Sequence, residues 1–255
     1  MRLVFLTQND PFYLPKIYQY LLPKLRENGH NIVSLILFDV APFGKKKSKL
    51  SQFIEAYKIF GFSFCLFYII KYLNSFFKTS ISKVMKDHNV KVIKLKQGVN
   101  HASSLKIISQ FNSDLLISLA GNEIFKKPLF NTSKYGVINL HSALLPKYRG
   151  LMPSFWVLCN NERKTGVSVF FVDEGIDSGP IIIQKELNLI NQTQEELIWQ
   201  LKFLGADAII EACNLISING VNTPTSKNSD LEMTYFSKPK RQDVNKFKSN
   251  GKKFY

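Results

Sequence analysis

The sequence predicts an α/β fold with a mostly parallel sheet. Short apolar runs of strand length alternate with longer segments whose apolar residues recur at helical spacing. Polar side chains stand where several apolar runs end, and in an open parallel sheet ligands bind at the carboxyl ends of the strands. The chain has 255 residues, 45% of them hydrophobic, which suffices for one substantial core. We therefore expect one domain with its site at a sheet edge.

The first half of the chain predicts repeated strand–helix units. A helical pattern that begins at Leu14 ends before Gly29, as helix ends commonly do. Another helix is expected to begin at Ala120. The strands expected in this half are 1–6, 31–38, 90–95 and 114–119, and the other helices are 14–28 and 103–111.

Residues 53–77 form an unusually apolar helix-like segment. Its longest uncharged run, 59–70, has 12 residues, fewer than the ~20 needed to cross a bilayer. Its aromatic side chains cover most of a helix circumference, which favours burial on more than one side. We expect a core helix that also forms a subunit contact in a homodimer. A patch on a membrane surface is the alternative, with attraction from the lysine run 45–49.

The segment 135–180 carries the candidate chemistry. Asn139 and His141 follow an apolar run, and Asp177 lies in the acidic loop DEGIDSGP after the next one. An amide can donate to a developing oxyanion, an imidazole can move protons, and a carboxylate can orient the imidazole. Together they suit addition of a nucleophile to a carbonyl. Taken singly, each also fits an ordinary turn, because Asn and Asp often bond their own backbone there.

Two segments together resemble a known family. NLHSALLPKYRG, followed after a helix by GVSVFFVDEGIDSGPII, is similar to the signature of the folate-dependent formyltransferases, which act on methionyl-tRNA, glycinamide ribonucleotide or nucleotide sugars. The resemblance implies a Rossmann-like core, 10-formyltetrahydrofolate as co-substrate, and Asn139, His141 and Asp177 as catalytic residues. Many members have His-Pro-Ser or His-Ala-Ser where this chain has His141-Ser142-Ala143. That departure alters the turn and leaves all three reactive groups in place.

The resemblance also implies where the folate binds. In the family, the turn after the fourth strand holds the pterin ring largely through backbone groups. A pterin edge has fixed donors and acceptors that suit main-chain amides and carbonyls. The loop before Asp177 supplies the other side. The implied cofactor-binding residues are Leu119, Gly121, Asn122, Val172, Asp173, Glu174 and Ile176.

Three residues are candidates for binding the acceptor substrate: Asn9, Lys147 and Arg149. Asn9 precedes Asp10-Pro11 and equally fits the start of a helix. Its loop has no glycine, whereas the glycinamide-ribonucleotide enzymes have a glycine-rich turn there, so that substrate is disfavoured. Arg149 fits a substrate-phosphate contact or a surface ion pair.

We expect residues 1–190 to form the catalytic core and 191–255 to form a C-terminal helix with a basic, strap-like tail. The helix is predicted at 193–218, and about 37 residues follow it. In the tail, Tyr235, Phe236 and Pro239 favour a strap across the core, with RNA contact as the alternative. The tRNA-modifying relatives carry a much larger C-terminal barrel. The chain's layout therefore favours the nucleotide-sugar enzymes.

Composition limits the remaining choices. The net charge of +15 suits a diphosphate substrate, although lysine-rich composition alone explains most of it. Cys65, Cys159 and Cys213 lie far apart in apolar segments, as buried reduced thiols do. The histidines lack metal-ligand spacing, so we predict no metal. The amino terminus lacks the features of a cleavable signal, which favours a cytoplasmic protein.

The predicted function is formyl transfer from 10-formyltetrahydrofolate to a primary amine, most simply that of a nucleotide-linked amino deoxysugar. No stable nucleic-acid partner and no transmembrane segment are expected. Methionyl-tRNA as acceptor and hydrolysis of the formyl-folate are alternatives within the same chemistry. A non-catalytic basic module that binds RNA or a membrane surface is the alternative from another class.

Overall fold

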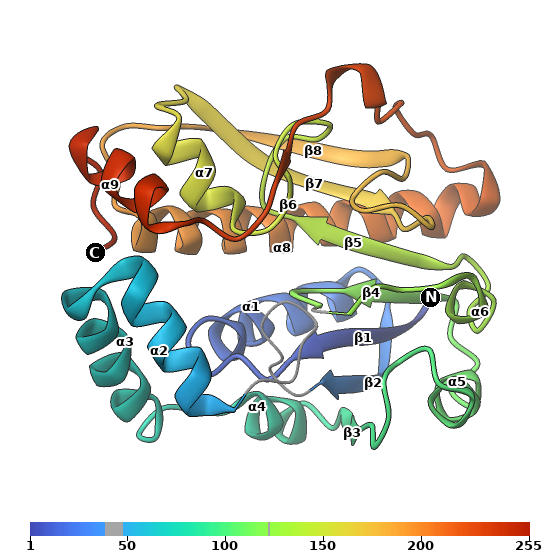
Figure 1. The fold of residues 1–255 in the computed structure, drawn as a ribbon. Helices are drawn as coiled ribbons and strands as arrows, with labels where there is room; N and C mark the ends of the chain where they lie inside the picture. The colour runs from blue at the N-terminus through green and yellow to red at the C-terminus, as the bar shows by residue number, and fades with distance from the viewer. Residues whose placement is uncertain (39–47, 122) are drawn as a thin grey trace.

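The computed structural model describes residues 1–38, 48–121 and 123–255, and its centre is a seven-stranded sheet (Figure 1). The strand order is β3-β2-β1-β4-β5-β7-β8. Neighbours from β3 to β5 pair in parallel, and β7 pairs antiparallel with both β5 and β8. The predicted α/β class with a mostly parallel sheet is confirmed. Residues 45–47 of the predicted lysine run lie outside the described residues, and Lys49 begins α2.

The elements follow the expected alternation of strands and helices. The strands are β1 Arg2–Gln8, β2 Asn31–Phe38, β3 Lys91–Lys94, β4 Leu115–Ser118, β5 Val137–His141, β6 Arg149–Gly150, β7 Lys164–Phe171, β8 Ile181–Asn188 and β9 Tyr235–Phe236. The helices are α1 Leu14–Glu27, α2 Lys49–Phe60, α3 Phe62–Ser75, α4 Ile81–Asp87, α5 Ala102–Ser109, α6 Lys127–Phe130, α7 Pro153–Cys159, α8 Gln194–Asn219 and α9 Arg241–Ser249.

Helices cover both faces of the sheet, and alternate strand residues face each layer. Ile138 and Leu140 of β5 belong to the large core cluster that includes α1 and α8 side chains. Val137 faces the other way, into the smaller cluster with α5 and α6 side chains. Gly205 lets α8 approach closely, because a Cβ there would lie 2.4 Å from Leu140 Cδ2. The large cluster runs from Leu3 to Phe254, so the predicted boundary after residue 190 stays a prediction.

The prediction of one long helix at 53–77 is wrong, because two helices, α2 and α3, occupy this segment. Gly61 separates α2 from α3 with φ +91° and ψ 179°, a conformation that interrupts a helix and that glycine adopts at little cost. The pair forms a hairpin at one end of the molecule (Figure 1). Only part of its apolar surface is buried within the chain, so burial of the remainder in a subunit contact stays a prediction.

The helix expected from Ala120 begins later than predicted. Ala120 has φ +57°, a left-handed conformation outside the helical region. The first helix after it is α6, which starts at Lys127 with proline in its first turn. The apolar periodicity of the sequence also gave no expectation for α4 or α9, which have seven and nine residues. Such short helices carry too few repeats for a clear pattern.

Residues 235–239 of the tail, called the strap below, lie against β6 and α7. Tyr235 and Phe236 form β9, which pairs in parallel with β6. Phe236 stacks on Tyr148 with ring centroids 5.1 Å apart and on Trp156 at 4.8 Å. Figure 1 shows this segment running over α7 and β6 before it enters α9. The strap therefore covers the turn that follows β5.

Candidate active site

Asn139 and His141 lie on one face of β5. They are two residues apart in a strand, so their side chains point the same way, together with Val137 toward the α5–α6 layer. They belong to the strand itself, whereas the sequence placed them after it. Ser118 of β4 pairs with Asn139, which places both at the carboxyl edge of the parallel strands. That edge is where ligands bind in open sheets.

His141 is buried and faces two acceptors. Its Nε2 lies 2.7 Å from the carbonyl oxygen of Tyr148, and its Nδ1 lies 3.5 Å from Asp177 Oδ2. A carbonyl oxygen can only accept, so Nε2 carries the proton of that hydrogen bond. The ring is then oriented by the turn after β5, with Nδ1 toward the carboxylate. A ring protonated on both nitrogens satisfies both acceptors.

Asp177 reaches His141 by a route that the sequence did not predict. Because β7 is antiparallel to β5, the loop after it starts at the amino-terminal end of β5, where the Val172 amide donates to the Val137 carbonyl at 2.8 Å. The loop then turns back toward His141. The Gly150 amide donates to Asp177 Oδ2 at 2.9 Å. The predicted meeting of imidazole and carboxylate is therefore observed in the geometry.

The side-chain amide of Asn139 is half-buried and makes no hydrogen bond within the described ranges. It shares the face of His141 and so can donate to a ligand there. An amide donor beside an imidazole–carboxylate pair can stabilise negative charge on a carbonyl oxygen while the pair moves a proton. The arrangement suits attack of a nucleophile on a carbonyl carbon.

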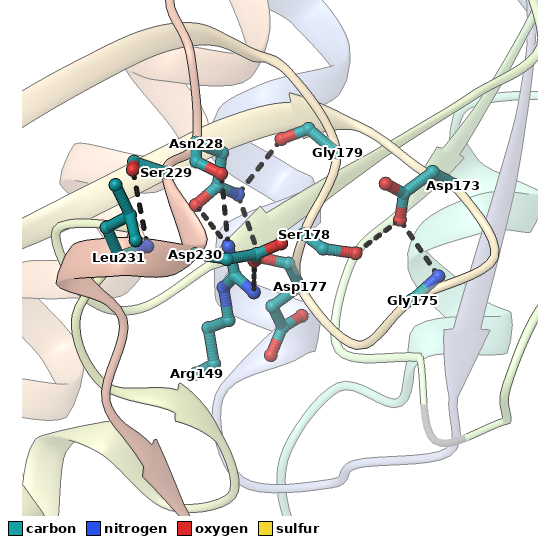
Figure 2. Close-up of polar contacts among 10 residues, drawn as sticks. All are labelled: Arg149, Asp173, Gly175, Asp177, Ser178, Gly179, Asn228, Ser229, Asp230 and Leu231. Carbon is teal, nitrogen blue, oxygen red and sulfur yellow. Dashed lines mark hydrogen bonds and ion pairs between the residues drawn. The ribbon is translucent and has the colours of Figure 1, made fainter.

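A second set of contacts, which the sequence missed, holds the Asp177 loop. Asn228 Nδ2 donates to the carbonyl oxygens of Asp177 at 2.8 Å and Gly179 at 3.0 Å (Figure 2). Arg149 Nη2 in turn donates to Asn228 Oδ1 at 2.9 Å. Nothing in the sequence near Asn228 identified it, because the contact joins segments 51 positions apart. The tail thus supports the loop that carries the carboxylate.

Arg149 is buried and internally paired. Its Nη1 donates to Asp230 Oδ1 at 2.7 Å, and its side chain is 5% exposed. Of the two expected roles, the ion pair is the one observed, although it is buried on the arginine side and not at the surface. Binding of substrate phosphate by Arg149 stays a prediction that would require it to release these partners. Lys147 and Asn9 are exposed.

The neighbouring Asp10, and not Asn9, bonds the turn that leads into α1. Asp10 Oδ1 accepts from the amides of Phe12 at 2.7 Å and Tyr13 at 3.4 Å. Burial raises the pKa of Asp10 despite the nearby Lys202 and these two amides. This geometry leaves the Asn9 side chain open toward solvent at the end of β1. Its role toward a substrate stays a prediction.

The expected folate-binding residues lie in two places. Leu119 is buried, its amide donates to the Leu6 carbonyl, and its own carbonyl accepts from Thr7 Oγ1 at 2.6 Å. Gly121 is exposed, and a Cβ there would lie 2.6 Å from Ser118 Oγ. A backbone that admits no side chain suits close approach of a flat ligand. Asn122 lies outside the described residues.

The other group of expected folate-binding residues lies in the loop after β7. Hydrogen bonds within this loop hold its backbone, while some of its side chains are exposed. Asp173 Oδ1 accepts from Ser178 Oγ at 2.6 Å and from the Gly175 amide at 3.1 Å (Figure 2). Glu174 is exposed, as is Ile176 at 49%. Val172 is half-buried and its amide is already paired with β5. Glu174 and Ile176 therefore remain open to a ligand, and the roles of all these residues stay predictions.

Cys65, Cys159 and Cys213 are buried free thiols, as predicted. Within the described ranges no cluster of three or more His, Cys, Asp or Glu side chains could hold a metal ion. No described helix is both long and apolar enough to span a bilayer.

Known proteins share part of this sequence and its fold. A family model described as formyl transferase matches residues 78–213. The methionyl-tRNA formyltransferase of Thermodesulfovibrio yellowstonii is 37% identical over 140 residues, which is 54% of this chain and 44% of that protein. The same enzyme of Clostridioides difficile is 38% identical over 129 residues, 50% of this chain and 41% of that protein. The match therefore spans less than half the length of either relative.

Solved structures share the fold. Glycinamide ribonucleotide transformylase 1 of Symbiobacterium toebii superposes with a TM-score of 0.62 at 15% identity, covering 90% of this chain and 94% of that one. The N-formyltransferase of Helicobacter canadensis in complex with folinic acid and dTDP-3-aminofucose gives 0.57 at 21% identity, covering 95% and 72%. The fold is that of the formyltransferases. This chain belongs to the formyl transferase family, as its two sequence segments predicted.

Proposed function

We propose that this protein transfers a formyl group from 10-formyltetrahydrofolate to a primary amine. The observation that carries the proposal is the buried His141–Asp177 pair beside the open amide of Asn139. Membership of the formyl transferase family supports it, as does the folinic acid named with the Helicobacter canadensis structure. Gly121 and the exposed residues of loop 173–176 are the places where the folate would bind.

In the proposed reaction an uncharged amine attacks the formyl carbon. Asn139 and protonated His141 stabilise the negative charge that develops on the oxygen. Asp177 holds the imidazole and relays the proton that the amine releases. Return of a proton to the departing nitrogen completes the transfer and releases tetrahydrofolate. Because His141 and Asp177 are nearly buried, water competes poorly for their hydrogen bonds.

As acceptor we propose a nucleotide-linked amino sugar. The sugar N-formyltransferase structures support this choice, because they match 93–95% of this chain, although at 20–21% identity. The net positive charge suits a nucleotide diphosphate. Methionyl-tRNA is the second candidate, supported by sequence identity to the tRNA enzymes. We propose a cytoplasmic location, where both acceptors occur, and no stable nucleic-acid partner.

Tetrahydrofolate release from 10-formyltetrahydrofolate tests the proposal. The purified protein is assayed with nucleotide-linked amino sugars, with methionyl-tRNA and with water alone. His141→Ala should lower turnover by roughly 10²–10⁴-fold with little change in folate binding, because it removes a proton-transfer group. His88→Ala, at the end of α4, is the matched control and should turn over normally. Turnover only with methionyl-tRNA would reassign the acceptor. Tetrahydrofolate release in water alone would indicate a hydrolase. Normal turnover by His141→Ala would contradict the proposed active site.

A further inference from the structure

The hairpin of α2 and α3, residues 48–77, exposes a large apolar surface. Along α2 the exposed side chains recur at intervals of three and four residues, and the same spacing continues through α3. Each helix therefore presents an apolar stripe to solvent. Twelve large hydrophobic side chains of this hairpin are exposed: Leu50, Phe53, Ile54, Tyr57, Phe62, Leu66, Ile69, Ile70, Tyr72, Leu73, Phe76 and Phe77. A patch of this size on a soluble domain marks an interaction surface.

The opposite side of the hairpin is firmly joined to the core. Phe60 and Phe64 stack at 4.3 Å, and Phe254 packs edge-on against both rings. Lys71 Nζ forms a largely buried ion pair with Glu195 Oε1 at 2.5 Å. The orientation of the hairpin is therefore set by the protein. The apolar stripes face outward because the inner face is already occupied.

Basic residues flank the apolar surface. Helix α9 packs on α2, where Arg241 Nη1 donates to the Ile59 carbonyl at 3.3 Å and Lys238 pairs with Glu55 at 2.8 Å. Residues 235–255 contain seven basic residues and one acidic residue. Lys248 and Lys253 are among the exposed ones. Figure 1 shows α9 and the C-terminus beside the hairpin at the same end of the molecule.

We propose that this end of the molecule binds the surface of an anionic lipid bilayer. An apolar face inserts at the boundary of headgroups and acyl chains, while nearby lysines attract acidic headgroups. Tyr57 and Tyr72 have the amphipathic rings that favour this boundary. A second copy of the chain fits less well, because a symmetric contact between hairpins would bring two lysine-rich segments together. The proposal concerns binding and is independent of the proposed reaction.

Co-sedimentation with vesicles tests the proposal on the full chain. Vesicles of phosphatidylglycerol mixed with phosphatidylcholine are compared with phosphatidylcholine alone. We expect the protein to sediment with the acidic vesicles and the bound fraction to fall as salt rises, because salt screens the lysine attraction. The double variant Phe62→Ser/Phe77→Ser removes two side chains that are 68% and 93% exposed. Its affinity should fall at least about tenfold.

Two further variants complete the experiment. Ile218→Ser/Val221→Ser removes comparable exposed apolar groups, 80% and 85% exposed, near the far end of α8 and should bind as the unaltered chain does. Lys248→Gln/Lys253→Gln should lose preference for acidic lipid. The proposal is overturned if the unaltered chain does not sediment with acidic vesicles, or if the Phe62/Phe77 variant binds equally well. A solution dimer that the same variant dissociates, without vesicle binding, would assign the face to a second copy.

Discussion

Asn228 holds Asp177 in the left-handed region of backbone space. The Asn228 side-chain amide donates to the carbonyl oxygen of Asp177 at 2.8 Å, and Asp177 has φ +50°. Such a conformation costs most non-glycine residues roughly 1–2 kcal/mol, and aspartate adopts it more readily than most. The bonds from Asn228 offset part of that cost. They also fix the loop so that the carboxylate faces Nδ1 of His141 and the amide of Gly150.

Replacing Asn228 by Asp should impair turnover more than folding. The carboxylate cannot donate to the Asp177 and Gly179 carbonyls, yet it keeps the size of asparagine and can still pair with Arg149. We expect kcat to fall by about 10–100-fold, with a smaller change in KM, because a small displacement of Asp177 misaligns His141. Steady-state formyl transfer measures this. Ser229→Ala, the adjacent control, should keep normal kcat. An unchanged kcat in Asn228→Asp would show that the loop carrying Asp177 keeps its conformation without the bonds from Asn228.

The sequence predicted the elements whose signal is local and missed those set by long-range contacts. Strand β2 and helix α8 follow from apolar periodicity alone. His141 and Asp177 were proposed because their residue types suit the chemistry and because their two segments resemble the formyltransferase signature. The antiparallel direction of β7 was not encoded locally. Asn228 carries no local signal, because its partners come from a distant segment.

Gly150→Ala should destabilise the fold more than Gly136→Ala. Both glycines have positive φ, +96° and +75°. A Cβ on Gly150 would also lie 2.4 Å from the carbonyl oxygen of Phe236 in the strap, whereas a Cβ on Gly136 meets nothing within 4 Å. We expect the free energy of unfolding to fall by about 2–4 kcal/mol in Gly150→Ala and by about 1–2 kcal/mol in Gly136→Ala. Urea titration measures both, and equal losses would mean that the strap moves aside without cost.

Phe254→Ala should weaken the attachment of the tail. The Phe254 ring is 9% exposed and lies 4.6 Å from the ring of Phe247 and 5.0 Å from that of Phe64. Truncating a buried phenylalanine costs about 3–5 kcal/mol. Tyr255→Ala should cost about 1 kcal/mol, because that ring is 45% exposed and stacks on Phe67. Thermal melts compare both variants with the unaltered chain. If all three have the same Tm, the C-terminal residues contribute little to folding.

His30 should make the protein less stable in mild acid. Burial lowers the pKa of His30 below its ordinary 6.5, although Nε2 lies 2.9 Å from Asn214 Oδ1. As the pH falls below 6.5, the unfolded chain takes up a proton that the folded state resists, so the free energy of unfolding decreases; well above 6.5 this histidine contributes no pH dependence. Tm is measured at about pH 7.5 and about pH 5.5, for the unaltered chain and for His30→Gln, whose amide can still bond Asn214. The Tm of the unaltered chain should fall more on acidification than that of the variant. The remaining titratable groups are common to both proteins. Equal decreases would therefore show that His30 takes up its proton freely in the folded state.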